Sequence, residues 1–259
     1  MANELSGKVA IVTGGTRNIG KVTSTMLAEA GAQVVIAGRS VDKGLRTAST
    51  IVANGGMCRY QETDLSREAD AERLIRTTVE DWGGLDIVVN NASPTDVALR
   101  DGRVADLATE DFDHFIGAGL RGAFWMFKYG VAAMEGSGCF VSISSNAAFA
   151  SRSAEPAYAA AKGGLNALAR QVAVDYGPHG IRSNTLVLGF IKTNATTPLL
   201  DDPRYGDQLR AGVPGPIPEA KDVAAAVLFL ASDAGRGFNG ATLVLDGGQS
   251  ALSSVPAFQ

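Results

Sequence analysis

Short runs of apolar, mostly β-branched residues alternate with longer amphipathic stretches along nearly the whole chain. The apolar runs are continuous, which is typical of strands that are buried on both faces. The predicted strands are Val9–Thr13, Gln33–Ala37, Cys58–Glu62, Leu85–Asn90, Cys139–Ser144, Ser183–Leu188 and Thr242–Leu245. Helical spacing predicts helices between them, at residues 19–30, 42–54, 67–82, 109–134, 157–177 and 221–232.

This alternation predicts an α/β fold, a doubly wound parallel sheet of about seven strands with helices on both faces. The crossovers that join parallel strands are expected to be right-handed. Because no linker-like segment or repeat interrupts the pattern, we expect residues 1–259 to form a single domain. Residues 190–218 are the exception, since they are rich in proline and have no clean period. Such a segment is commonly a substrate loop or lid, and the alternative is a floppy surface insertion.

The composition narrows the class of protein. A net charge of −4 gives no basic surface of the kind that nucleic acids require, so no nucleic-acid partner is expected. No apolar run reaches the length of about 18 residues that a membrane span needs. The two cysteines, Cys58 and Cys139, favour a reducing, cytoplasmic location without a disulfide framework. With two well-separated histidines and no ligand spacing, we expect no metal site.

A glycine-rich turn follows the first predicted strand and leads directly into the first predicted helix. Its sequence is Thr13-Gly-Gly-Thr-Arg-Asn-Ile-Gly20. Glycines at such a turn let the backbone approach a pyrophosphate, and the helix N-terminus supplies unpaired N–H groups and a positive dipole end. We therefore predict a dinucleotide site whose contacts include Gly14, Thr16, Arg17, Asn18, Ile19 and Gly20.

The end of the second predicted strand bears on the choice of dinucleotide. An acidic residue there would bind the adenosine ribose and favour NAD, but the strand ends in Gly38-Arg39. Arg39 and Arg17 could instead hold the 2′-phosphate of NADP, because guanidinium groups suit phosphate geometry. We expect NADP(H) to be preferred, with NAD(H) possible. Asp64, after the third strand, could meet the adenine amino group or cap a helix that starts near Ser66.

Tyr158 and Lys162 are four residues apart in a predicted alanine-rich helix, so their side chains share one face. An ammonium beside a phenol favours the phenolate, and we expect the pKa of Tyr158 to lie below its usual value of about 10. General acid/base catalysis near neutral pH benefits from that shift. Ser145 stands at the carboxyl end of the strand Cys139–Ser144, where ligands of open α/β sheets bind. Tyr158 follows Ser145 by thirteen residues, so both are expected near this edge of the sheet.

Together with Asn90-Asn91-Ala92 and the terminal Leu245-Asp246-Gly247-Gly248, these motifs resemble those of the short-chain dehydrogenases/reductases. The resemblance covers about residues 5–250 and implies a Rossmann-like sheet. It also implies hydride transfer between a nicotinamide and a small carbonyl or alcohol substrate, with Tyr158 as general acid/base, Ser145 on the substrate oxygen and Lys162 on the nicotinamide ribose. Further cofactor contacts that it implies are Tyr158, Leu65, Asn91, Ala92, Gly189, Ile191 and Thr193, with Asn90 lining the adenosine side.

The sequence departs from the family pattern at several positions. Asn18 replaces the middle glycine of the turn, and since asparagine tolerates left-handed backbone angles we expect the turn to survive. Ser93 and Leu188 also replace family residues, a glycine and a proline. Gly119 takes the place of an asparagine that supports a proton-relay water, so slower turnover is expected. The alternative to an enzyme is therefore a dinucleotide-binding sensor or regulatory protein with weakened catalysis. Dehydration or epimerisation on the same scaffold is a related alternative.

The resemblance also suggests where the substrate and further copies of the chain bind. We expect the substrate beneath residues 190–218, against Phe149 and Glu155. The predicted helices 109–134 and 157–177 are rich in glycine and alanine. By family analogy they form the interfaces of a homo-oligomer, a tetramer or a dimer.

Overall fold

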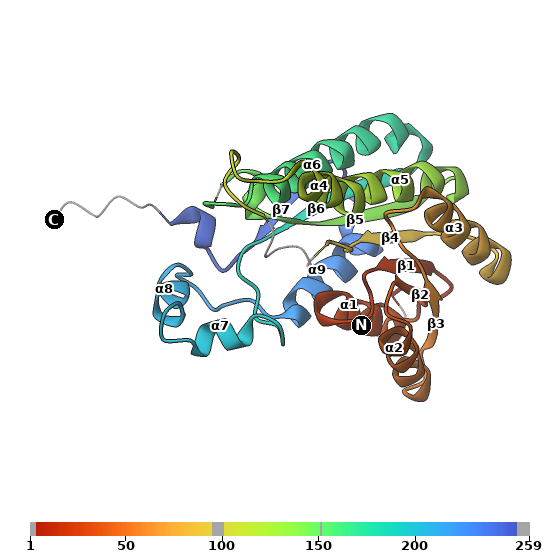
Figure 1. Ribbon diagram of the computed structural model, residues 1–259. Helices are drawn as coiled ribbons and strands as arrows, with labels where there is room; N and C mark the ends of the chain where they lie inside the picture. Colours follow the sequence, from red (N-terminus) through yellow and green to blue (C-terminus); the bar gives the residue numbers. More distant parts are fainter. Residues whose placement is uncertain (1–3, 95–100, 151, 253–259) are drawn as a thin grey trace.

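The computed structural model describes residues 4–94, 101–150 and 152–252 (Figure 1). These residues form one sheet of seven parallel strands in the order β3-β2-β1-β4-β5-β6-β7. The strands are β1 (Val9–Thr13), β2 (Gln33–Gly38), β3 (Met57–Glu62), β4 (Ile87–Asn90), β5 (Gly138–Ser145), β6 (Ile181–Leu188) and β7 (Thr242–Leu245). The predicted α/β class with a doubly wound parallel sheet is confirmed. Every predicted strand lies within two residues of an observed one.

Helices cover both faces of this sheet (Figure 1). One face carries α1 (Asn18–Glu29), α2 (Val41–Ala53) and α9 (Ala220–Ala231), and the other carries α3 (Glu68–Trp82), α5 (Gly122–Ala133) and α6 (Pro156–Tyr176). Successive side chains of β1 enter opposite layers, Ala10 and Val12 on the first face and Ile11 on the second, as the period of two requires. No helix in the described part of the chain is both long and apolar enough to cross a membrane.

The helix predicted over 109–134 is not continuous. It divides into α4 (Thr109–Phe115), a π-helical stretch η1 (Ile116–Arg121) and α5. Gly117 and Gly119 lie within η1, and glycine weakens a regular α-helix because its backbone is so free in the unfolded chain. The π-helical turn widens the helix where it passes the cleft, and such turns are frequent at functional sites.

Residues 190–218 contain more regular structure than their sequence predicts. Two short helices form there, α7 (Thr197–Asp201) and α8 (Gly206–Ala211). Each is too short to show a helical period, which is why the sequence pattern missed them. The role of this segment as a substrate loop or lid stays a prediction.

Candidate active site

The glycine turn between β1 and α1 brings backbone atoms into very close approach. Gly14 has φ of 65°, and a Cβ on it would lie 3.0 Å from the Ala92 Cα. A Cβ on Gly20 would overlap the carbonyl oxygen of Gly14. Asn18, the first residue of α1, has φ of 47°, so it adopts the left-handed conformation that a glycine would favour at this position. The expectation that the turn tolerates Asn18 is confirmed.

Thr13 and Asn91 fasten this turn to the end of β4. The Thr13 hydroxyl donates to the Val89 carbonyl at 3.1 Å and accepts from the backbone N–H groups of Asn91 and Ala92, both at 3.0 Å. The Asn91 amide donates to the Thr13 carbonyl at 2.9 Å. These bonds tie together the carboxyl ends of two neighbouring strands, β1 and β4, beside the cleft.

A cleft of about 950 Å³ opens along the carboxyl ends of the strands. It brings together all the residues predicted for the cofactor and catalytic sites except Asn90. These are Gly14, Thr16, Arg17, Asn18, Ile19, Gly20, Arg39, Asp64, Leu65, Asn91, Ala92, Ser145, Tyr158, Lys162, Gly189, Ile191 and Thr193. Residues as far apart in sequence as Gly14 and Thr193 therefore face one space, as the parallel sheet requires.

Three expected positions lie elsewhere. Asn90 does not line the cleft, and its side chain is buried, because as the last residue of β4 it points into the protein interior. Asn91, the next residue, lines the cleft as expected. Phe149 and Glu155 do not line the cleft either, and Phe149 is exposed. Their neighbours Asn146 and Arg152 line it instead.

The end of the cleft near β2 is rich in cations. Arg17, Arg39 and Lys43 all line it. Asp64 lines it too, and its carboxylate accepts hydrogen bonds from the Ser66 backbone N–H at 3.0 Å and hydroxyl at 2.9 Å. Partial burial raises the pKa of Asp64, but the Ser66 hydrogen bonds and the nearby charges of Arg39 and Arg67 outweigh it and hold that pKa below its usual value. Asp64 is thus an anion, and it stabilises a turn rather than capping α3, which begins two residues after Ser66.

Ser145 and Lys162 are both held by backbone groups. Ser145 is the last residue of β5, and its Oγ accepts from the Ala147 N–H at 3.2 Å. Lys162 lies on α6 with 6% of its surface exposed, and its Nζ donates to the Ile143 carbonyl of β5 at 2.8 Å. Burial lowers the pKa of Lys162 to about 8. The ammonium is therefore anchored to the strand that carries Ser145.

The expected direction of the Tyr158 pKa shift is wrong for this structure. Burial is the largest influence and raises the pKa of Tyr158 above 10, while a hydrogen bond with Ser145 and the charge of Arg152 lower it by less. The Lys162 Nζ lies 5.7 Å from the centroid of the Tyr158 ring and is directed to a strand carbonyl. Tyr158 and Lys162 both line the cleft, as their spacing of four residues predicts. The ammonium of Lys162, however, binds the Ile143 carbonyl.

Two residues that support the site carry no recognisable sequence signal. Asp101 accepts hydrogen bonds from the backbone N–H groups of Ala157 at 3.3 Å and Tyr158 at 3.0 Å, so it caps the first turn of α6. Gln249, in the short helix η5 (Gln249–Ala251), accepts from the Asn146 amide at 3.3 Å and from the Phe190 N–H at 3.1 Å. Both partners are distant in sequence and lie outside any regular pattern, so only the fold reveals them.

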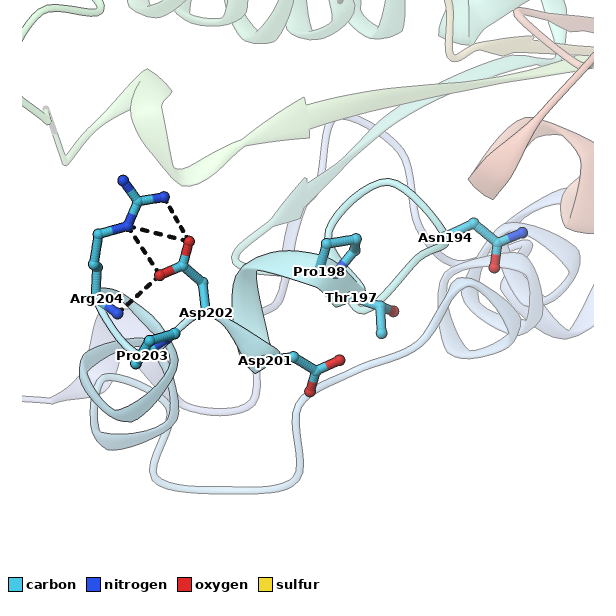
Figure 2. A pocket seen from close by; sticks show the side chains of 7 residues that line it. All are labelled: Asn194, Thr197, Pro198, Asp201, Asp202, Pro203 and Arg204. Atoms are coloured by element: carbon cyan, nitrogen blue, oxygen red, sulfur yellow. Dashed lines mark hydrogen bonds and ion pairs between the residues drawn. The ribbon is translucent and has the colours of Figure 1, made fainter.

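A second hollow lies over α7 and the turn that leads to α8. Figure 2 shows its lining residues, Asn194, Thr197, Pro198, Asp201, Asp202, Pro203 and Arg204. Asp202 and Arg204 pair with each other there, with Arg204 Nη2 2.7 Å from a carboxylate oxygen. None of the predicted site residues lines this hollow.

Known proteins share this arrangement. Residues 14–250 match the family model described as enoyl-(acyl carrier protein) reductase. The NADP-dependent (R)-specific alcohol dehydrogenase of Lentilactobacillus kefiri is 36% identical and covers 97% of this chain and 100% of its own. A short-chain dehydrogenase from Burkholderia cenocepacia, solved in complex with NADP, is 31% identical with a TM-score of 0.87, over 96% of this chain and 100% of that one. The chain is therefore an oxidoreductase that belongs to the short-chain dehydrogenase/reductase family.

Proposed function

We propose that this protein interconverts a ketone and a secondary alcohol with NADP(H), using Tyr158 as the general acid/base. The observation that carries the proposal is that Ser145, Tyr158 and Lys162 line the same cleft as the glycine turn. A nucleotide phosphate fits at this turn, because Gly14, Thr16 and Gly20 line the cleft where α1 begins, and the first backbone N–H groups of a helix have no partner within it. The names of the Lentilactobacillus relative and the Burkholderia complex support the choice of NADP.

When bound, the nicotinamide supplies or accepts the hydride. Tyr158 gives its phenol proton to the substrate oxygen during reduction and takes it back during oxidation. Ser145, whose Oγ is fixed by the Ala147 N–H, donates a hydrogen bond to the same oxygen and stabilises the charge that develops there. Lys162 has three N–H donors, so it can bind ribose hydroxyls while it keeps its bond to Ile143.

We test this activity by measuring NADPH consumption across a panel of ketones and NADP⁺ reduction across the matching alcohols. Turnover of at least one pair in both directions supports the proposal. Tight NADPH binding without turnover of any ketone or alcohol would instead favour a sensor or regulatory protein. Such a protein would use the cleft for binding alone.

Replacing Arg39 with aspartate is expected to shift the cofactor preference toward NADH. Arg39 and Arg17 line the cleft where β2 ends, and the substitution exchanges a phosphate-binding cation for an acid that binds ribose hydroxyls. The ratio of kcat/KM with NADPH to that with NADH should fall by about 10- to 100-fold, the value of one or two charge-assisted hydrogen bonds. Arg46→Asp, an exposed change on α2 outside the cleft, is the control. An unchanged ratio in Arg39→Asp would rule out the 2′-phosphate pocket.

Replacing Gly119 with asparagine is expected to raise kcat. A Cβ at this position would make ordinary contacts, 3.5 Å from the Ala161 Cβ and 3.6 Å from the Pro94 Cδ, so the π-helical turn accepts a Cβ without displacing its neighbours. The amide would restore a hydrogen-bonding group beside α6, worth about 2- to 10-fold in rate. Gly119→Leu is a control, because it fills similar space without polar atoms. An unchanged or lower kcat in Gly119→Asn than in wild type would contradict our interpretation of this position.

A further inference from the structure

The part of the cleft around Tyr158 carries positive charge. Arg152 lines it together with Ser145, Asn146 and Tyr158. Among the described residues that line the cleft, one carboxylate occurs, Asp64, and its neighbouring charge is Arg39 at the opposite, β2 end. The described lining around Tyr158 therefore offers a cation and no carboxylate to the substrate.

Arg152 is held so that part of its guanidinium remains accessible. Its Nε donates to the Glu155 carboxylate at 3.0 Å, and 56% of the Arg152 side chain is exposed. Solvent-exposed pairs of this kind are weak, because water screens both charges. Within the described residues the two terminal nitrogens of the guanidinium make no hydrogen bond that would prevent them from binding a ligand. A bidentate anion could therefore displace or supplement Glu155.

The backbone between these two residues is strained. Ala154 has φ of 63°, in the left-handed region that alanine rarely adopts. Strained residues persist where the surrounding structure requires them, and they cluster at ligand clamps. Here the strained residue lies in the turn that brings Glu155 back to Arg152.

The charge on Arg152 acts near the reacting position. It lowers the pKa of Tyr158, after the larger effects of burial and of the Ser145 hydrogen bond, and the opposing effect of Glu155 is smaller. The net effect of this ion pair on the phenol is therefore that of the cation.

A second polar group on this side has an unmet hydrogen-bonding capacity. His114 of α4 lines the cleft, and its Nε2 is buried without a partner among the described residues. The next residue, Phe115, packs with Ala157 and Tyr158, which places this end of α4 beside the catalytic tyrosine. A polar substrate group could satisfy that nitrogen.

We propose that the substrate is an anionic ketone, an oxoacid or its hydroxyacid counterpart, and that Arg152 is the specificity residue that binds its carboxylate. The proposal rests on the ketone reductase activity proposed above. Arg152 binds the carboxylate with its terminal nitrogens, and Glu155 competes for the same guanidinium. Glu155 thus sets how strongly the anion is held.

The test compares straight-chain oxoacids of increasing length with their methyl esters, using NADPH and the full chain. We expect wild type to have a higher kcat/KM for an oxoacid than for its ester. Arg152→Gln should lower the oxoacid-to-ester ratio of kcat/KM by about 10- to 100-fold, mainly through KM. Glu155→Gln should move the ratio in the opposite direction, because it removes the competing carboxylate. Arg76→Gln is the matched control, since Arg76 is exposed to the same extent as Arg152 and pairs with Glu80 on α3, outside the cleft.

The outcomes separate this inference from the proposed function. If esters and neutral ketones are reduced but the ratio in Arg152→Gln equals that in Arg76→Gln, Arg152 does not bind a substrate carboxylate and this inference is wrong, while the reductase activity stands. A higher kcat/KM of wild type for the esters than for the oxoacids would also show that this inference is wrong and leave the reductase activity standing. If neither the oxoacids nor the esters are reduced while another ketone of the panel is, the substrate assignment alone fails. If no ketone of the panel is reduced, the proposed function fails as well.

Discussion

Replacing Tyr158 with phenylalanine is expected to lower kcat for ketone reduction by about 100- to 10 000-fold, while NADPH still binds. The change removes one oxygen, the proton donor, and keeps the ring that packs with Phe115 and Ala157. The fold and the glycine turn should therefore be unaffected. The measurement is NADPH consumption under saturating ketone, together with a fluorescence titration of NADPH binding.

A matched control removes a tyrosine hydroxyl elsewhere. Tyr129 on α5 donates a hydrogen bond to Glu68 at 2.9 Å and does not line the cleft, so Tyr129→Phe should retain turnover. A Tyr158→Phe variant that turns over at more than a tenth of the wild-type rate would exclude the phenol as the proton donor. Ser145 or a bound water would then have to supply the proton.

The positions of the strands and of the cleft could be predicted because parallel strands buried on both faces leave continuous apolar runs. The run Val9–Thr13 matches β1 residue for residue, and the turn after it contains glycines whose replacement would clash with backbone. Once the strand ends were located, Ser145 and Asn91 had to lie at one edge of the sheet. This argument needed no knowledge of side-chain packing.

The contacts between distant segments could not be predicted, because no local pattern encodes them. Asp101 is 57 residues from Tyr158 and caps its helix from a segment without a period. Arg152 and the strained Ala154 lie in a turn whose sequence resembles any other polar loop. The π-helical turn in η1 is likewise hidden, since the residues around Gly119 keep an approximately helical spacing. Each of these features depends on burial and on side-chain direction, which the local sequence pattern does not show.

The direction of the Tyr158 pKa shift was missed for the same reason. Helical spacing places Lys162 on the same face as Tyr158, but the Nζ finds a nearer partner in the Ile143 carbonyl. Burial then dominates and raises the pKa of Tyr158. The phenol is therefore protonated at neutral pH, which is the form that reduction requires. The opposite direction, alcohol oxidation, needs the proton removed and is favoured as the pH rises.

Replacing Lys162 with methionine is expected to stabilise the protein without cofactor at pH 7. It should also lower kcat/KM by at least about 100-fold, because the side chain that positions the nicotinamide ribose is lost. Burial lowers the pKa of this lysine from 10.5 to about 8, so at pH 7 the folded state holds an ammonium that it disfavours. That shift corresponds to about 3 kcal/mol of lost stability, and the bond to Ile143 returns about 1 kcal/mol. The net gain in the variant is about 2 kcal/mol.

The pH dependence of this gain identifies its cause. Below pH 8 the lysine is protonated in both folded and unfolded states, so the penalty is fully present. Between pH 8 and 10.5 the folded state has lost the proton and the unfolded state retains it, so the wild type gains stability as the pH rises. The advantage of Lys162→Met should therefore be largest at pH 7 and shrink toward pH 10. Urea unfolding of both proteins without cofactor at pH 7 and pH 10 measures it.

Lys128→Met serves as the control, because Lys128 is exposed and its hydrogen bond with Glu68 raises rather than lowers its pKa. That variant should show no gain at pH 7 and keep its activity. If Lys162→Met is less stable than wild type at pH 7, or its advantage is the same at both pH values, the buried lysine is not a stability penalty. The site would then hold a charge that the surrounding dipoles fully compensate. If the prediction holds, Lys162 destabilises the folded protein at neutral pH. Its presence in the cleft is then explained by ligand binding and not by stability.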